Sequence, residues 1–387
     1  MTTGMTNIAL GANSRVAYLV QSSVGEIPTS PEWKVLPVDN YDPQVQHNQL
    51  ENNALKGTRD RLKPRAGTVN AMFNASGRFY PDIYDDLLSA GLQSAWGQKF
   101  SETNIGISVN ATNKTFTRSS GSWLDHFIIV GDDILFAGFT EAGEGGNNGL
   151  FEVTAVTESV LTFGNAIGLA DTAAERSVTA ATPYSYLMVG SDRSKVAVEV
   201  FYSDVGEYQR FVNVEVASIS ISVDSQGDAI INFSLTGGAE LNLGANIGDE
   251  IAGATYTYPG KNFFDSFSGS LRQNNTQIAT VTSIGQNFDN QSNPLFIIGS
   301  RYPGTVSHGK VNGNFDITVF YADNEIKEKF QSEEVVSIEV NFTNDVGNDY
   351  NVFSIYYPKA KVVSYSRPVG GDTEIVQNLT LQPFKFI

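Results

Sequence analysis

Histidine most often carries catalysis and metal binding near neutral pH, and this chain of 387 residues has only three histidines. They are His47, His126 and His308, and none has a second ligand at a spacing such as His-Glu-x-x-His. Each is therefore expected to be a surface or loop residue. The chain has no cysteine, which excludes disulfides, thiolate metal ligands and a cysteine nucleophile.

Adjacent acids could serve glycoside hydrolysis or calcium binding. Neighbouring residues on a strand point to opposite faces, so such a pair seldom shares one site. The EF-hand loop pattern and the Gly-x-Ser-x-Gly nucleophile motif are missing, and the glycine-rich stretch 143–149 lacks the Lys-Ser/Thr of a phosphate loop. The adjacent pairs are Asp85-Asp86, Asp132-Asp133, Asp249-Glu250 and Glu333-Glu334. We predict no catalytic residue, no cofactor-binding residue and no metal site.

One segment reverses the sign of the local charge. Half of the residues in 56–65 are basic, in a chain whose formal net charge is -17. An acidic protein surface could bind such a segment, because Arg pairs with carboxylates in a bidentate manner. The segment could also be a solvated hairpin tip, with ion pairs contributing about 0–1 kcal/mol each, or a phosphate contact. We favour the first interpretation. The basic residues are Lys56, Arg59, Arg61, Lys63 and Arg65.

Composition indicates a folded protein rich in β-structure. Hydrophobic residues make up 41% of the chain, which excludes a disordered polymer, and the aromatic residues are mostly Phe and Tyr, which suit strands. The strong negative charge argues against a protein that reads DNA sequence, because such a protein carries a basic stripe. No signal peptide pattern opens the chain and no run approaches about 18 consecutive apolar residues, so no membrane insertion is expected.

Alternation of apolar and polar residues is the dominant pattern along the chain, and it predicts strands with one buried face. The clearest examples are residues 196–202, 214–223 and 336–342. Only two helices are predicted, Pro81–Leu92, with a proline in its first turn, and Asp323–Gln331, with an aspartate as N-cap. Two short helices among many strands indicate a mainly-β fold.

An internal repeat defines the predicted organisation. Four short matches recur in the same order in both halves of the chain, and each predicted helix follows its Gly-x-Val-Asn strand at a similar distance. The matches are Asn40–Gln44 with Asn287–Gln291, Gly67–Phe73 with Gly309–Phe315, Val196–Gly206 with Val336–Gly347, and Asn232–Leu235 with Asn378–Leu381. The sequence therefore predicts two tandem β-sandwich modules, each with one short helix.

The spacing of these matches exposes an insertion. Phe73 and Val196 are 123 residues apart, whereas their counterparts Phe315 and Val336 are 21 residues apart. The extra residues have their own strand-and-turn pattern, which predicts a small inserted β-barrel or sandwich at a surface loop. The predicted plan is a first module of residues 1–100 and 184–243, an inserted domain of 101–183, a polar linker of 244–266 along the surface, and a second module of 267–387.

Several short motifs resemble the siphophage-type phage tail tube protein family. The N-terminal run with Gly25-Glu-Ile-Pro28 and Pro31-Glu-Trp33 is similar to its opening signature, and the basic loop that leads to Gly67 is similar to its polar loop. Residues 82–91 resemble the helix that follows, and the C-terminal run with Tyr356-Tyr-Pro-Lys-Ala360 resembles the closing hairpins. The resemblance implies a β-sandwich with a flanking helix, assembly into rings, and a tube that guides the genome during ejection.

A doubled module changes the expected stoichiometry. Many members of the resembled family have one module and form hexamers, so three double-module chains would complete a ring with pseudo-six-fold symmetry. We expect modules to pair at their open strand edges, the basic loop to contact the adjacent ring, and the inserted domain to face outward. The expected partners are further copies of the chain and the tape measure, tail terminator and distal tail proteins. The expected location is the virion tail, assembled in the host cytoplasm, with DNA passing non-specifically through the lumen.

Two other functions fit the composition. A virion decoration protein or adhesin could bind host-surface glycans through the inserted domain, but this would not explain a doubled module. A carbohydrate-active enzyme on a β scaffold is the weakest of the three, because the sequence offers no recognisable catalytic pair. The sequence alone does not decide which alternating strand positions face a lumen, since a shift of one residue exchanges the two faces.

Overall fold

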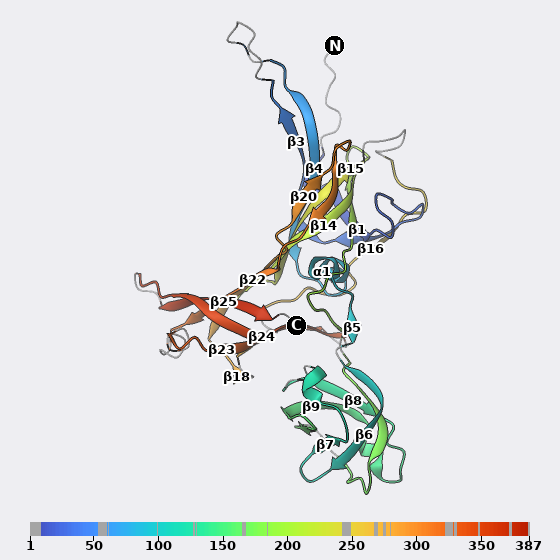
Figure 1. Cartoon of the computed structure of the whole chain (residues 1–387), viewed down its shortest axis with the longest axis vertical. Coiled ribbons are helices and arrows are strands. Elements are labelled where there is room, and N and C mark those ends of the chain that lie inside the picture. The colour runs from blue at the N-terminus through green and yellow to red at the C-terminus, as the bar shows by residue number, and fades with distance from the viewer. Residues whose placement is uncertain are drawn as a thin grey trace. The chain divides into compact units, whose positions relative to one another are not determined.

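The computed structural model describes residues 9–52, 60, 62–98, 100–126, 128, 130–164, 168–183, 185–241, 249–266, 270–273, 276–278, 280–321, 328, 331–346, 349–370 and 374–385. Strands dominate it, as the sequence predicts (Figure 1). The chain divides into two compact units, which are Met1–Ser94 with Val189–Ile387, and Ala95–Met188.

The smaller unit is a closed six-stranded barrel, with strand order β10-β7-β6-β11-β8-β9. Its inward positions carry large aromatic side chains that fill the interior, with Phe116 and Phe136 ring centroids 4.6 Å apart. The predicted small β-barrel is thus confirmed. The elements of this unit are β5 (Gly97–Gln98), β6 (Ser101–Asn110), β7 (Thr115–Arg118), η2 (Trp123–His126), β8 (Asp133–Ala137), η3 (Glu144–Asn147), β9 (Gly149–Val156), β10 (Val160–Phe163), β11 (Arg176–Ala181) and β12 (Ser185–Tyr186).

The larger unit contains one sheet of fifteen strands and the short hairpin β20–β21. Its first elements are η1 (Gly11–Asn13), β1 (Ser14–Val20), β2 (Glu32–Leu36), β3 (Val38–Leu50), β4 (Arg65–Arg78), α1 (Asp85–Leu92), β13 (Val196–Tyr202), β14 (Glu207–Asp224), β15 (Ile230–Glu240) and β16 (Thr255–Thr257). The later ones are β17 (Ser270–Gln273), β18 (Thr276–Gln277), β19 (Val281–Asp289), β20 (Asn293–Phe296), β21 (Pro303–Ser307), β22 (Asn312–Phe320), β23 (Val335–Val346), β24 (Asp349–Ser366) and β25 (Val376–Lys385).

Strand β14 joins the two halves of the sheet. One of its edges pairs with β15 along most of its length. The opposite edge pairs with β13 over residues 207–214 and with β19 over residues 218–224. Because β19 belongs to the C-terminal half of the chain, β14 connects sequence-distant strands directly through the backbone ladder.

The strand pairing on the two sides of this junction has the same register. Phe73 of β4 lies opposite Leu235 of β15, and Phe315 of β22 lies opposite Leu381 of β25. These are the residues that the sequence matches equate. The pairing of β14 with β15 and of β24 with β25 is also the same, with Val216 opposite Leu235 and Val362 opposite Leu381.

The irregularities of the ladders recur as well. The pairing of β13 with β14 shifts after Val196, and that of β23 with β24 shifts after Val336, its counterpart 140 residues later. The pairing with the next strand shifts after Val216 in β14 and after Val362 in β24, which are 146 residues apart. Bulges at equivalent positions give both runs of strands the same bend and twist.

One of the four sequence matches is wrong by four residues. Asn40 lies opposite Ser76, and Ser283 lies opposite Thr318, which is the counterpart of Ser76 in the shared register. The equivalent of Asn40 is therefore Ser283 and not Asn287. A shift by an even number of residues keeps the same side chains on the same face of a strand, so the residue pattern alone does not reveal the error.

Helix α1 begins later than predicted. It starts at Asp85 rather than at Pro81, because Asp82 adopts a positive φ of 69° that interrupts the helix. Gly91 lies inside its last turn, where a β-carbon would collide with Ile219 of β14, so the glycine allows close packing of helix and sheet. Of the second predicted helix, only Glu328 and Gln331 are among the described residues; both are helical, and the Ser332 N–H donates to the Glu328 carbonyl at 2.8 Å.

The segment predicted as a surface linker contributes to the larger unit. Residues Thr255–Thr257 form β16, which pairs in parallel with β2. Phe264 is fully buried, with its ring centroid 5.1 Å from that of Phe79. The residues of β16 are exposed or half-buried, whereas Phe264 is in the core, because burial of an aromatic side chain is favourable.

Candidate functional site: a polar sheet face and two strand edges

Eight strands of the larger unit form a continuous run in the order β3-β4-β15-β14-β19-β22-β25-β24. Along each strand, successive side chains point to opposite faces of the run. One face is apolar and buried, with Phe73, Ile219, Phe233, Phe315 and Leu381 among its residues. Burial of this face fixes the register and thereby decides which residues occupy the other face.

The other face is polar and consists of small side chains. Direct cross-strand pairing places six Asn and Ser residues in one row across six strands, and a second row lies beside it. The first row is Asn40, Ser76, Asn232, Ser220, Asn287 and Asn314. The second row is Asp42, Asn74, Ser234, Ser218, Asp289 and Asn312. Residues of both rows line a shallow hollow in this face.

Charge on this face is sparse and mostly negative. Asp42 and Asp289 are the charged residues of the two rows, and neither row contains Lys or Arg. The next outward residue of β4 on this face is Arg78, which is bound to Asp228 at 2.6 Å and lies 3.5 Å from Asp39. Hydrogen bonding to Asp228 raises the pKa of Arg78, so its charge stays paired. Such a face gives phosphate groups few sites to bind.

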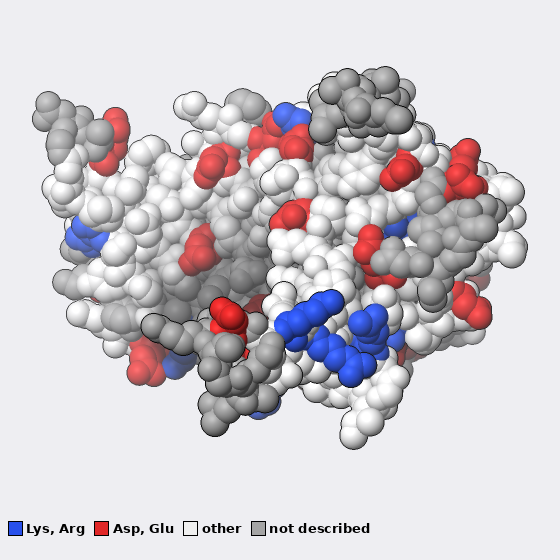
Figure 2. Space-filling view, turned by 90° about the horizontal axis from the view of Figure 1, so that it is seen from above, with Lys and Arg blue, Asp and Glu red and all other residues white. Residues whose placement is uncertain are grey.

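Charged side chains are also few on the face of the molecule that Figure 2 shows. Figure 2 shows one face of the molecule, on which uncharged residues predominate and Asp and Glu are scattered. The visible Lys and Arg side chains are few, and several of them gather in one group. With 17% charged residues in the chain, below the usual quarter, this surface resembles one that packs against other copies of itself.

The run of eight strands ends in two edges. In the part of the chain that the structure describes, β3 pairs with β4 alone. The C-terminal part of β24, from Val362 to Ser366, pairs with β25 on one edge, and no described strand lies on its other edge. In the equivalent part of β14, from Ser218 onward, the edge that corresponds to this open edge of β24 pairs with β19. An edge of unpaired backbone groups favours addition of another strand.

A comparison of the sequence with models of protein families gives a match. Residues 11–383 match the model of the family described as phage tail tube protein, which is nearly the whole chain. The chain belongs to the phage tail tube protein family. No curated protein matches it in sequence.

Membership assigns this tail tube protein a structural role. It is a component of the virion tail, it assembles with copies of itself into a tube, and it works with other tail proteins. The resemblance in the short motifs is thus confirmed, and so is the mainly-β fold class. The polar face and the two edges are therefore candidate surfaces of an assembling structural subunit.

The basic segment of this tail tube protein is only partly described. Lys56, Arg59 and Arg61 lie outside the described residues. Lys63 and Arg65 are exposed, immediately before and at the start of β4. The prediction that these five residues contact an adjacent ring stays a prediction.

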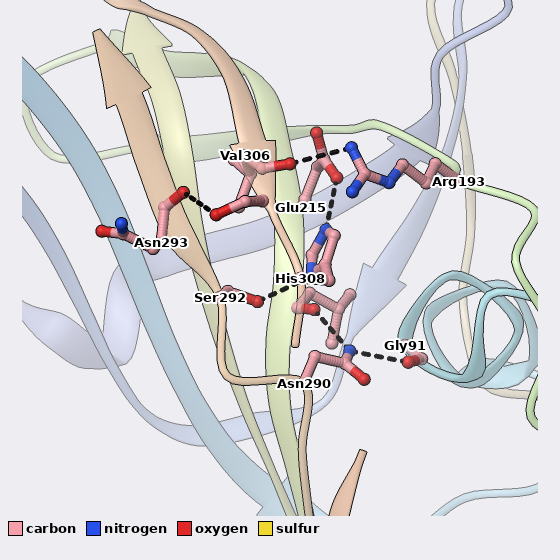
Figure 3. Close-up of polar contacts among 10 residues, drawn as sticks. Gly91, Arg193, Glu215, Asn290, Ser292, Asn293, Val306 and His308 are labelled. Atoms are coloured by element: carbon pink, nitrogen blue, oxygen red, sulfur yellow. Dashed lines mark hydrogen bonds and ion pairs between the residues drawn. The ribbon is translucent and has the colours of Figure 1, made fainter. Parts of the chain in front are cut away.

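His308 is a loop residue, which is one of the two alternatives predicted for the histidines, but it is not on the surface. Its side chain is buried, with Nε2 2.8 Å from Glu215 and Nδ1 2.9 Å from the Ser292 hydroxyl (Figure 3). The ring connects the residue after β21 to β14, whose Glu215 is 93 positions away in sequence. No local motif could reveal this pair, because its two members meet only once β19 has joined β14.

Three other polar contacts hold the same region together. Asn290 donates to the carbonyl oxygens of Gly91 at 2.7 Å and Val216 at 3.0 Å, and Arg193 donates to the carbonyl of Val306 at 2.8 Å (Figure 3).

Among the described residues, no group of three or more His, Asp or Glu side chains is placed to hold a metal ion. Within the same residues, no helix has the length and apolar character to cross a bilayer.

Proposed function

We propose that this chain carries the tube module twice and that three chains close into a ring with pseudo-six-fold symmetry. The first module comprises residues 1–100 and 184–243, the second 267–387, and residues 101–183 are inserted in the first. Support comes from the shared register and shared bulges of the two strand runs. Each chain then gives eight strands to an inner wall, which is the run described above.

The pairing of β19 with β14 is the observation that carries this proposal. It is a contact between the two modules of one chain, and its two partners have counterparts, β3 and β24, that are not paired with each other. Pairing β3 of one chain with β24 of the next would repeat the same contact. A closed ring would then have no open strand edge, which removes the tendency to add further strands.

The internal contact also gives the expected register between chains. Ser218 pairs with Asp289 within the chain. The counterpart of Ser218 in β24 is Ser364, and the counterpart of Asp289 in β3 is Gln46. Ser364 of one chain is therefore expected opposite Gln46 of the next chain, with Ser366 opposite Gln44.

The proposed ring is wide enough for DNA. Eight strands from each of three chains, spaced about 4.8 Å apart and tilted by about 40°, give a wall roughly 45–50 Å across. Barrels of 16–18 strands already enclose an aqueous channel. The Asn and Ser rows would line the lumen, because the opposite face is buried in the core. A neutral to negative lining would let DNA slide without binding to it.

The other parts of the proposal concern assembly. Rings would stack into a tube, with Lys56, Arg59 and Arg61 of the basic segment contacting the adjacent ring. The tape measure, tail terminator and distal tail proteins would be the partners, and assembly would take place in the host cytoplasm. Passage of viral DNA during ejection would be the function of the lumen.

A disulfide experiment tests the ring, since the chain has no cysteine of its own. The double variant Gln46→Cys with Ser364→Cys should form disulfides between chains, because directly opposed strand residues lie within disulfide distance. Under non-reducing conditions the covalent ladder should stop at three chains. Asn287→Cys with Ser220→Cys is the matched control, which should close within one chain because these residues already face each other.

A second control tests the register itself. Val45→Cys with Ser364→Cys should not form disulfides, because Val45 points to the opposite face of β3. A ladder that continues to six chains would contradict the three-chain ring. A contrary outcome is that the double variant assembles into tubes without a disulfide between positions 46 and 364, although the control pair within one chain does form its disulfide. That outcome would contradict pairing of β3 with β24.

A further inference from the structure

The first strand run is here β13-β14-β15-β4-β3, and the equivalent second strand run is β23-β24-β25-β22-β19. The hairpin β20–β21 covers one corner of the first strand run. It connects β19 to β22 and packs on β15, where Val306 is only 1% exposed. A β-carbon on Gly237 of β15 would collide with Val306, so the two backbones approach closely. The Val69 N–H of β4 donates to the Arg301 carbonyl at 2.7 Å. The hairpin thus covers a part of β14, β15 and β4 that would otherwise be open.

The corner that this hairpin covers carries two opposite charges. Arg193 precedes β13 and donates to the Val306 carbonyl, while Glu215 of β14 contacts His308 at the base of the hairpin (Figure 3). Asn290 fixes the other base of the hairpin through the Gly91 and Val216 carbonyls. The hairpin is therefore held at both of its ends by polar contacts to the first strand run.

The first strand run has an equivalent hairpin. In the shared register, residues 47–66, which include the end of β3 and the start of β4, correspond to residues 290–308 between β19 and β22, a difference of one residue in length. The described parts of this connection, 47–52 and 62–66, are here called the arm. The pairing of β3 with β4 shifts after His47, and His47 is the counterpart of Asn290, where the other hairpin turns.

The arm itself lies uncovered. β3 and β4 continue as a long hairpin past the neighbouring strands (Figure 1). Leu50 at the end of β3 is 54% exposed. Lys63, Pro64 and Arg65 are exposed as well. An isolated two-stranded hairpin is marginally stable in water, so the arm needs a surface to pack on.

The second strand run offers the corner that corresponds to the covered one. Counting back from Val196 and from its counterpart Val336, the counterpart of Arg193 is Glu333, and the counterpart of Glu215 is Lys361. These two form an ion pair at 2.9 Å, and Glu333 is 79% exposed. Exposed apolar residues occur on strands β23, β24 and β25, namely Val335, which lies opposite Lys361, Val363 of β24 and Phe384 of β25. Glu333, Val335, Lys361, Val363 and Phe384 are here called the β24 corner.

Charge identifies the occupant of the β24 corner. The residue of the arm that corresponds to Val306 is Pro64, and it stands between Lys63 and Arg65. Where Arg193 contacts the hairpin in the first run, Glu333 would therefore meet two basic residues. In the first run the cation Arg193 meets a backbone carbonyl of an uncharged stretch of hairpin, whereas in the second run the carboxylate of Glu333 would meet the two cations of the arm, so the arm and this corner have complementary charge.

We propose that the arm of one chain docks on the β24 corner of the next chain, with Lys63 and Arg65 against Glu333 and Leu50 against the apolar side chains. The proposal rests on the ring proposed above, because pairing β3 with the neighbour's β24 brings the arm to this corner. It assigns Lys63 and Arg65 to a contact within the ring rather than to the adjacent ring. The arm then completes the neighbour's second module as β20–β21 completes the first module.

A double-mutant cycle tests the charge contact. Glu333→Gln alone and Lys63→Gln with Arg65→Gln should each weaken chain association by up to about fivefold at low salt, which corresponds to about 1 kcal/mol and is the upper range for an exposed ion pair. Combined, the three changes should weaken association no more than the arm changes do alone. Fully additive losses would overturn the proposal, and so would arm changes that shorten tubes while leaving ring formation unchanged.

A crosslink gives an independent readout. Pro64→Cys with Glu333→Cys, treated with a short bismaleimide, should join neighbouring chains of assembled protein. The control is Asn293→Cys with Ser307→Cys, which should join within one chain because these residues lie opposite each other in the hairpin β20–β21 and neither is buried. The cysteines at positions 46 and 364 could form their disulfide while positions 64 and 333 do not crosslink. That result would overturn docking of the arm but would still support the proposed ring. Failure of both would contradict the ring itself.

Discussion

Replacement of Glu199 by alanine should be among the most destabilising single changes in this tail tube protein. Glu199 is 1% exposed, and Arg210 beside it is 5% exposed. Its carboxylate accepts a hydrogen bond from Arg210 Nε at 2.8 Å and another from the Tyr256 hydroxyl at 2.8 Å. A second cation, Arg15, lies 3.6 Å away. The carboxylate thus balances a buried positive charge and connects β16 to β13.

The size of the effect follows from what remains after the change. Removing one partner of a buried ion pair leaves an uncompensated buried charge and costs about 3–5 kcal/mol. At an m-value of about 2–3 kcal/mol/M, the urea midpoint should fall by about 1–2.5 M. Glu199→Met with Arg210→Met should recover most of this loss, because a well-packed apolar pair can replace a buried ion pair.

The second strand run provides the matched control. Glu339 is the counterpart of Glu199, but it lies opposite Tyr356, and Arg272 is 4.0 Å from its carboxylate. Glu339→Ala should therefore cost at most about 1 kcal/mol. Urea unfolding can be followed by fluorescence of Trp33, which packs in one cluster with Ala197 and Val212, after Trp96 and Trp123 are replaced by Phe. A loss below about 1 kcal/mol for Glu199→Ala would refute the assigned role of this ion pair.

Four further predictions concern assembly and stability. Replacing residues 101–183 by a short Gly-Ser bridge should leave ring formation intact in electron micrographs, and loss of rings would contradict the domain plan. Neutralising Arg59, Arg61 and Arg65 together should preserve the circular dichroism spectrum but weaken assembly, most clearly at low salt, where charges are least screened; unchanged assembly would exclude a contact role for the segment. Ser220→Lys with Asn232→Lys should make purified tubes retain DNA at low salt and release it at high salt, whereas DNA that passes unretained would argue against a lumen at this face. Burial, with Asp82 adding to it, raises the pKa of Asp85 in the folded chain; the charged form is therefore disfavoured by folding, so Asp85→Asn should raise the unfolding temperature at neutral pH, and the gain should vanish as pH falls below the usual aspartate pKa.

The sequence predicts strands best where the alternation of apolar and polar residues is enough to identify a strand and its buried face. Residues 336–342 become β23 with the alternating burial that the sequence predicts. Residues 196–202 become β13, but residues 196–200 are buried on both faces rather than on one. The match of Phe73 to Phe315 also survives, because both residues are core positions opposite a leucine. The four-residue error at Asn40 shows the limit of this signal, since an even shift preserves the pattern of faces.

Features that depend on tertiary packing could not be predicted. The start of α1 depends on the backbone of Asp82, and burial of Phe264 depends on its contact with Phe79. The contact between His308 and Glu215 forms only when strands from opposite halves of the chain pair. The polar face required both the register and the bulge after Val216, because a bulge exchanges the faces of the residues beyond it.

A cryo-EM cross-section of the assembled tube tests the central claim most directly. It should resolve three chains per ring, with β3 of each chain laddered to β24 of the next chain as β19 is laddered to β14. Six chains per ring, or strands β3 and β24 that end without a neighbour in the assembled tube, would contradict the account.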